Sequence, residues 1–221
     1  MGNFRTIFQS SFAEDIYEKS RFIAYCKPIN TEAEATVFIE QIKKKHWDAA
    51  HNVPVYVLGE NYSVQRYSDD GEPSGTAGVP ILSMLKNEGI TDVVVVVTRY
   101  FGGIKLGTGG LVRAYTHTAK LGLESSLLIE KVVYVHLNVK VDYHLHGKIQ
   151  NYLIGIEDVI IEDTVFSNLV DLELYVLPEA LQGVMSKLTD LCSGQLTLQE
   201  LGEAYLSIHN GEILEKNLIE V

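Results

Sequence analysis

The sequence predicts an α+β protein of two domains, residues 1–131 and 132–221. One observation is a run of five consecutive valines within residues 92–98, which is typical of a strand covered by helices on both faces. Another is the pattern order after residue 131, strand–helix–strand–strand–helix–strand, which is the ferredoxin-like order. A third is charge: the first domain holds 14 Lys and Arg against 15 Asp and Glu, and the second holds 4 against 14. A polyanion should therefore contact the first domain.

The composition is that of a soluble globular protein. Of the 221 residues, 46% are hydrophobic and 21% are charged. No apolar run approaches the roughly 20 residues that a membrane helix needs, and the first residues lack the apolar stretch of a secretory signal. The two cysteines provide no disulfide framework and fit a reducing compartment. We expect a cytoplasmic monomer with no membrane contact and no cofactor.

The first domain begins with a weak pattern and continues with clear ones. Residues 1–12 are expected to be a loosely attached lead, and residues 13–19 a short helix. Residues 20–26 are rich in aromatic and apolar side chains, which predicts a strand. Thr31 and the glutamate three residues later form a capping box before apolar residues at helical spacing, so we expect a helix over 32–45.

Turn residues define the elements that follow. A Gly-Glu-Asn turn between residues 53–58 and 62–67 predicts a hairpin. Pro80 is tolerated only in the first turn of a helix, so a helix should begin near residues 77–79 and end before Gly89. After the valine strand, apolar residues at helical spacing predict a long helix over 107–125.

The second domain alternates strands and helices and ends in an acidic tail. We expect strands at 132–141, 159–163, 169–177 and 195–208, with helices at 144–154 and 178–191. The tail from residue 210 carries apolar residues at helical spacing, which favours a helix there.

Two glycine-rich motifs, SDDGEPSGTAG at residues 68–78 and VTRYFGGIKLGTGGLVRAY at residues 97–115, dominate the first domain. Each leads into a predicted helix start. Such starts have unpaired N–H groups and a partial positive charge, so either could hold an anion. Neither motif is a Walker A loop or a Rossmann fingerprint, because the required lysine and glycine spacings are absent.

The two motifs in this order resemble the YigZ/IMPACT family, and the matching residues run from about 20 to 119. The resemblance implies a first domain like domain 2 of the small-subunit ribosomal protein five, the type also found in domain IV of elongation factor G. It implies a ferredoxin-like second domain of the elongation factor G domain V type. It further implies a regulator of translation whose partner is RNA, the ribosome or a translation-related protein.

The first motif offers carboxylates and small residues. Asp69 and Asp70, with Glu72 nearby, could bind magnesium, which takes one or two carboxylates together with water and phosphate, or could act as an acid–base pair. The alternative is a solvated turn, which Asp-Gly favours. Three small residues before the helix either cap it or bind a phosphate: Ser74, Gly75 and Thr76.

The second motif offers cations. Arg99 follows the buried strand, Lys105 lies in the glycine loop, and Arg113 lies about one turn into the helix. Together they could clamp a phosphate beside Gly107 and Gly109. The alternative is a network of ion pairs from the two arginines to the carboxylates of the first motif.

Aromatic side chains and one histidine complete the candidate binding site. Tyr100 and Phe101 lie next to Arg99, and aromatic residues among basic ones suit stacking of single-stranded bases. Packing beneath the glycine loop is the alternative. His51 lies just before a strand and near both motifs, where it could be a polar contact, a structural residue or a metal ligand.

No Ser-His-Asp order, zinc spacing or nucleophile elbow is visible, so we assign no catalytic residue and favour a protein that is not an enzyme. Two hypotheses follow from the motifs. The first is a regulator of translation that binds RNA, the ribosome or a protein through its first domain. The second is an enzyme or sensor that binds a small phosphorylated ligand between the two glycine-rich loops.

Overall fold

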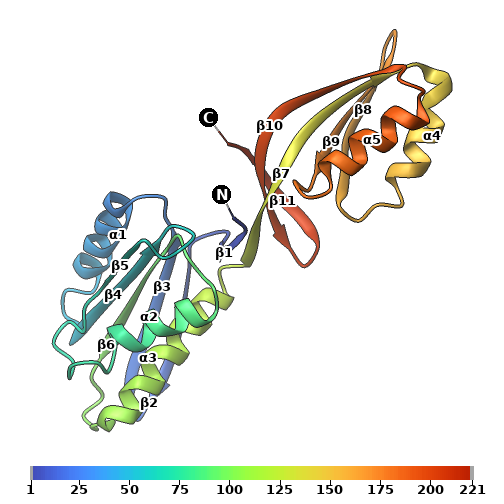
Figure 1. The fold of residues 1–221 in the computed structure, drawn as a ribbon. Helices are drawn as coiled ribbons and strands as arrows, with labels where there is room; N and C mark the ends of the chain where they lie inside the picture. The colour runs from blue at the N-terminus through green and yellow to red at the C-terminus, as the bar shows by residue number, and fades with distance from the viewer. Residues whose placement is uncertain (1, 220–221) are drawn as a thin grey trace. The chain divides into compact units, whose positions relative to one another are not determined.

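The computed structural model describes residues 2–219, so Met1, Glu220 and Val221, at the ends of the two predicted domains, lie outside the described residues. The chain forms two compact units. One comprises Met1–Lys131 with His209–Glu212, and the other comprises Val132–Ile208 with Ile213–Val221. Both units contain helices and strands, so the α+β class is confirmed (Figure 1).

The first unit is built on an antiparallel sheet whose strand order is β2-β3-β6-β4-β5. Its strands are β2 (Ser11–Tyr17), β3 (Ser20–Pro28), β4 (His51–Leu58), β5 (Val64–Tyr67) and β6 (Val93–Tyr100). The valine strand β6 is central, as predicted, and every residue from Val93 to Arg99 is buried. Because β4 runs antiparallel to β6, the end of β6 lies beside the start of β4, at one end of these two inner strands.

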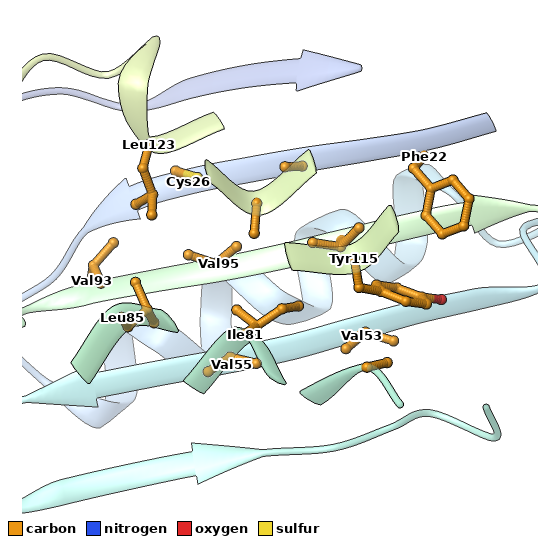
Figure 2. Close-up of a cluster of buried hydrophobic side chains, with 14 of the residues drawn as sticks. Phe22, Cys26, Val53, Val55, Ile81, Leu85, Val93, Val95, Tyr115 and Leu123 are labelled. Carbon is orange, nitrogen blue, oxygen red and sulfur yellow. The ribbon is translucent and has the colours of Figure 1, made fainter. Parts of the chain in front are cut away.

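Helices cover both faces of this sheet, which is why β6 is apolar throughout. Val94 and Val96 pack in the core beneath α1 (Glu32–Lys45). Val93, Val95 and Val97 pack against α2 (Gly78–Asn87) and α3 (Gly107–Glu124), and Figure 2 shows two of them among the side chains of that core. Burying a valine contributes about 1.5–3 kcal/mol, so this strand anchors both layers.

Helix α1 has the predicted bounds. The Thr31 hydroxyl accepts a hydrogen bond from the Glu34 N–H at 3.2 Å, as a capping box requires. The Glu34 carboxylate reaches one residue further back than that motif specifies and accepts the N–H of Asn30 at 2.9 Å. Lys43, Lys44 and Lys45 close the helix, where positive charge is favourable.

Two predictions at the N-terminus are wrong. Residues 13–19 are not a helix, because Ser11–Tyr17 is strand β2, whose side chains alternate between two faces. Residues 1–12 are not a loose lead, because β1 (Phe4–Ile7) pairs with the first residues of β7. The hairpin between β2 and β3 turns at Glu18 and Lys19, which have φ of 43° and 66°. Two-residue hairpin turns usually contain glycine or asparagine. Neither residue is present here, so nothing in the local sequence indicated a turn.

The second unit has the predicted ferredoxin-like arrangement with one added strand. Its sheet order is β11-β10-β7-β9-β8, and α4 and α5 pack on a shared apolar core. The elements are β7 (Leu128–Val141), α4 (Tyr143–Leu153), β8 (Val159–Phe166), β9 (Val170–Val176), α5 (Leu181–Leu191), β10 (Leu196–His209) and β11 (Glu212–Leu218). The helix predicted after residue 210 is wrong, because Asn210 and Gly211, with φ of 50° and 84°, turn the chain back into β11. No helix within residues 2–219 is both long and apolar enough to cross a membrane.

Candidate functional site

A pocket of about 530 Å³ lies where the end of β6, the start of β4 and the start of α3 meet. Arg99, near the end of β6, and Phe101, just after it, line the pocket, and His51 lines it from β4. The first glycine-rich loop contributes Glu72 and Pro73. The second contributes four consecutive residues, Lys105, Leu106, Gly107 and Thr108. Antiparallel pairing of His51 with Arg99 therefore brings the two predicted loops to one hollow.

A buried ion pair forms one wall of the pocket. A guanidinium nitrogen of Arg99 lies 2.6 Å from Oε1 of Glu72, and both residues are less than 10% exposed. The Tyr115 hydroxyl donates a hydrogen bond to the same carboxylate oxygen at 2.8 Å. Burial, together with the charge of Glu72, raises the pKa of Tyr115, so this hydroxyl keeps its proton. A buried charge requires such partners.

Two aromatic rings lie close to the Arg99 guanidinium. Its central carbon is 5.3 Å from the Phe22 ring centroid and 5.4 Å from that of Phe101. These distances are within the range of cation–π attraction. Its Nε is buried and has no acceptor among residues 2–219. Several groups thus hold Arg99 in place. Its pairing with Glu72 is one of the ion pairs that the sequence allowed as the alternative to a phosphate clamp.

The first glycine-rich loop supplies its own anion to helix α2. One oxygen of Asp69 accepts the N–H groups of Ala77 and Gly78 at 3.1 and 2.8 Å, and the other accepts that of Gly75 at 2.8 Å. Burial acts to raise the pKa of Asp69, but these three backbone hydrogen bonds together hold it below its ordinary value. The Thr76 hydroxyl donates to the Pro73 carbonyl at 2.7 Å. The start of α2 is therefore occupied by a carboxylate of the chain itself.

Asp70 is also engaged with protein groups. Its carboxylate accepts the N–H of Asn52 at 2.7 Å and lies 3.8 Å from the Lys43 ammonium, and its carbonyl lies 2.7 Å from Nδ1 of His51. Within the described chain, no group of three or more His, Cys, Asp or Glu side chains is placed to hold a metal ion. The two aspartates thus fix loop geometry at the edge of the pocket.

Asp69→Asn tests this capping role. We expect the free energy of unfolding to fall by about 1 kcal/mol at neutral pH, because asparagine keeps an acceptor but loses the charge at the helix start. The folded pKa of Asp69 is lowered, so its carboxylate stabilises the fold above the unfolded pKa. This contribution is lost as pH falls through the folded pKa. Urea unfolding at a series of pH values should show the two proteins converge in acid. The exposed Glu40→Gln is the matched control, and a constant difference at every pH would contradict the assignment.

The start of α3 differs from that of α2: within residues 2–219, no carboxylate accepts its first N–H groups as Asp69 accepts those of Ala77 and Gly78. Leu106 occupies the N-cap position, and Gly107 has φ of +68°, a conformation that glycine adopts without strain. Thr108 and Gly109 follow in the first turn. The unpaired N–H groups at the start of an 18-residue helix carry partial positive charge. Lys105 adds a full charge next to them, so this helix start is suited to hold an anion.

The structure brings some predicted site residues together and separates others. His51, Arg99, Phe101, Lys105 and Gly107 line the pocket. Other predicted residues lie outside its lining: Ser74, Gly75, Thr76, Tyr100, Gly109 and Arg113. Arg113 lines a second hollow of about 610 Å³ with His117 and Lys120, and Leu106 lines both hollows.

Two polar residues of the pocket lining were absent from the predicted binding set. Glu72 was considered as a carboxylate of the candidate magnesium site and as an ion-pair partner of the arginines, and Thr108 only as part of the glycine motif. The burial of Glu72, at 8% exposure, was not readable from the local sequence.

Comparison with protein families gives two matches. Residues 18–123 match the model of the Impact N-terminal domain, and residues 139–195 match a domain of unknown function, DUF1949. The first match contains both glycine-rich loops and the pocket between them.

Individual proteins resemble most of the chain. The chain is 41% identical over 201 residues to the IMPACT family member YvyE of Bacillus subtilis, covering 91% of this chain and 92% of that protein. It is 34% identical to the IMPACT family member YigZ of Escherichia coli, covering 84% and 92%. A crystal structure described as that of a hypothetical protein matches with a TM-score of 0.57 and 30% identity, covering 90% of this chain and 97% of the other. The resemblance thus extends over both units.

Proposed function

Since this chain belongs to the IMPACT family, we propose that it is a non-enzymatic regulator of translation that binds RNA through its first unit. In this proposal the protein acts in the cytoplasm as a monomer, and its partner is either free RNA or RNA within the ribosome. One observation carries the proposal: the uncapped start of α3, with Lys105 beside it, opens into a pocket. Phosphate is one of the anions that such a helix start binds.

The groups around this helix start suit a nucleotide chain. A backbone phosphate would accept N–H groups of the first turn of α3 and the Thr108 hydroxyl, with Lys105 as its counter-charge. Phe101 is 53% exposed and offers a ring face to a base. The Glu72 carboxylate does not repel the phosphate strongly, because Arg99 neutralises it at 2.6 Å.

A second set of cations continues along α3. Arg113, His117 and Lys120 lie on one side of the helix and line the neighbouring hollow. Lys120 is paired with Glu88 at 2.8 Å, and His117 lies 3.6 Å from Asp15. Arg113 has no carboxylate partner among residues 2–219, so it is the cation best placed to take a second phosphate.

Lys105→Ala and Arg113→Ala, alone and together, test the RNA site. Binding of a short single-stranded RNA, and pelleting with ribosomes, should be measured between about 50 and 200 mM salt. We expect weaker binding, and the slope of log affinity against log salt should become shallower by about 0.7 for each phosphate that is no longer neutralised. Arg99 is left intact because it holds the buried carboxylate.

The matched control is Lys187→Ala, which removes an exposed positive charge from α5 of the second unit. It should leave the affinity and the salt slope unchanged. Failure of the wild-type protein to bind RNA at low salt would contradict the proposal, as would equal binding by the double variant and the wild type.

A small phosphorylated ligand is the second candidate, and the size of the pocket favours it. A volume of about 530 Å³ lies within the range of small-molecule sites, which is about 300–1,000 Å³. Nucleotides and sugar phosphates should then raise the unfolding temperature. The expected gain is about 2.7 kcal/mol when the ligand is at 100 times its dissociation constant. Stabilisation by such a ligand without RNA binding would favour this candidate over the first.

A further inference from the structure

A second group of aromatic side chains lies on the face of the first sheet that carries α1 and in the loop that follows this helix. Trp47, the single tryptophan of the chain, is 83% exposed, and Phe12 on β2 is 65% exposed. Phe12 stands directly opposite Tyr25 of β3, so the two share a face. Their rings stack with centroids 6.0 Å apart. Tyr25 also belongs to the core beneath α1, which places Phe12 on that same side of the sheet.

Hydrogen bonds hold the inner rings of this group in place. Nε2 of His46 lies 2.7 Å from the Tyr25 hydroxyl, and its Nδ1 lies 2.9 Å from the Tyr100 hydroxyl. The Tyr100 hydroxyl donates a hydrogen bond to the Asp48 carboxylate at 3.1 Å, so its oxygen accepts the hydrogen bond from Nδ1–H of His46. Nε2 of His46 then accepts a hydrogen bond from the Tyr25 hydroxyl. Burial, with the nearby charge of Lys45, lowers the pKa of His46, which favours the neutral ring that this arrangement needs.

Positive charge accompanies the aromatic rings. Helix α1 ends in three lysines, and Trp47 follows two residues after the last of them. The Lys45 ammonium lies 4.6 Å from the Tyr25 ring centroid, on the stack that Phe12 extends. Lys44 and Lys45 are both exposed. Exposed aromatic faces beside lysines are the combination that binds single-stranded nucleic acid without sequence preference.

The loop after α1 lies at the same end of the sheet as the pocket, and Phe12 lies three residues back from that end, in the row of Tyr25 and Val96. Arg99 and Phe101 line the pocket, whereas Tyr100 between them contacts His46 on the other face. The loop after α1 connects the two sides: Trp47 is exposed on it, Ala50 lines the pocket, and the Ala50 N–H donates to the Arg99 carbonyl at 2.9 Å. A single-stranded RNA that leaves the pocket can therefore continue over the loop that carries Trp47.

We propose that Trp47 and Phe12 form a stacking surface for the bases of single-stranded RNA, with Lys44 and Lys45 contacting its phosphates. The inference rests on the proposed RNA-binding function and extends it to a second surface on the opposite face of the sheet. Charge complementarity and the exposed ring faces select single-stranded RNA as the occupant, because a duplex keeps its bases stacked on one another and offers them no free face.

Tryptophan fluorescence tests this directly, because all of it comes from Trp47. Titrating the full chain with oligouridylate should quench the emission in a saturable way, whereas a duplex RNA of equal length should quench it far less. In a separate assay with fluorescently labelled oligouridylate, Trp47→Ala and Phe12→Ala should each weaken binding about 5- to 150-fold, the effect of losing one stacked base. Trp47→Phe should restore most of the affinity.

The control variant is Phe166→Ala, which removes an aromatic ring of similar exposure from the second unit. It should bind as the wild type does. RNA binding that Lys105→Ala weakens but Trp47→Ala and Phe12→Ala do not, with unchanged fluorescence, would overturn the stacking surface and leave the site at α3 standing. Absence of any RNA binding by the wild type would overturn both.

Discussion

Replacing Glu72 with glutamine is expected to destabilise the first unit by about 3–5 kcal/mol, the cost of leaving one member of a buried ion pair without its partner. Glutamine keeps the shape and one acceptor oxygen, so the Tyr115 hydroxyl and the Arg99 guanidinium still find a hydrogen-bond acceptor. The lost quantity is the negative charge that neutralises Arg99, which is only 5% exposed. Against a typical stability of about 5–15 kcal/mol, this loss is large.

Urea unfolding followed by circular dichroism measures this effect, and Tyr115→Phe is the matched control. That variant deletes one hydrogen bond to Glu72 and leaves the ion pair, so it should cost only about 1.5–3 kcal/mol. The double variant Glu72→Leu/Arg99→Met removes both charges and should be more stable than Glu72→Gln. If the free energy of unfolding of Glu72→Gln lies within about half a kcal/mol of the wild-type value, the buried ion pair does not stabilise the pocket wall.

Gly102→Ala is expected to have the second large effect, because there is no room for a methyl group at this position. An added Cβ would lie 2.0 Å from the carbonyl carbon of Lys19 and 2.4 Å from the backbone nitrogen of Ser20. Both are backbone atoms of the β2–β3 turn, so no side chain can move aside. Overpacking of this kind costs about 1–3 kcal/mol or more, and it also strains the Gly102 hydrogen bond to the Ser20 hydroxyl at 3.1 Å.

The neighbouring glycine supplies the control. Gly103 has φ of +85° and open space around it, so Gly103→Ala should cost only the backbone strain of about 1–2 kcal/mol. Thermal and urea unfolding of the two variants should therefore rank Gly102→Ala as the less stable. Equal stability would mean that the close approach of the second loop to the β2–β3 turn does not restrain this loop.

The sequence by itself determined the elements whose local pattern and final packing agree. Helix α1 has a capping box, an apolar stripe and a basic end, and β6 has five valines that fit only a strand covered on both faces. The two glycine motifs determined the family, and the element order after residue 131 determined the ferredoxin-like arrangement. Strands β2 and β11 were missed because turns through Glu18 with Lys19 and through Asn210 with Gly211 connect them to their partners. Pairing, more than intrinsic propensity, sets strand structure.

Only the tertiary structure decided the roles of chemically similar residues. Asp69 and Glu72 are carboxylates three positions apart, yet one caps α2 in a partly exposed loop and the other lies buried against Arg99. Arg99 and Arg113 flank the same loop, yet one is buried in a wall and the other faces a separate hollow. Both glycine motifs lead to a helix start, but Asp69 accepts the first N–H groups of α2, whereas no carboxylate within residues 2–219 does so at α3. These differences depend on which backbone groups the fold places within hydrogen-bond distance of each side chain, and that distance is set by strand pairing between distant parts of the chain.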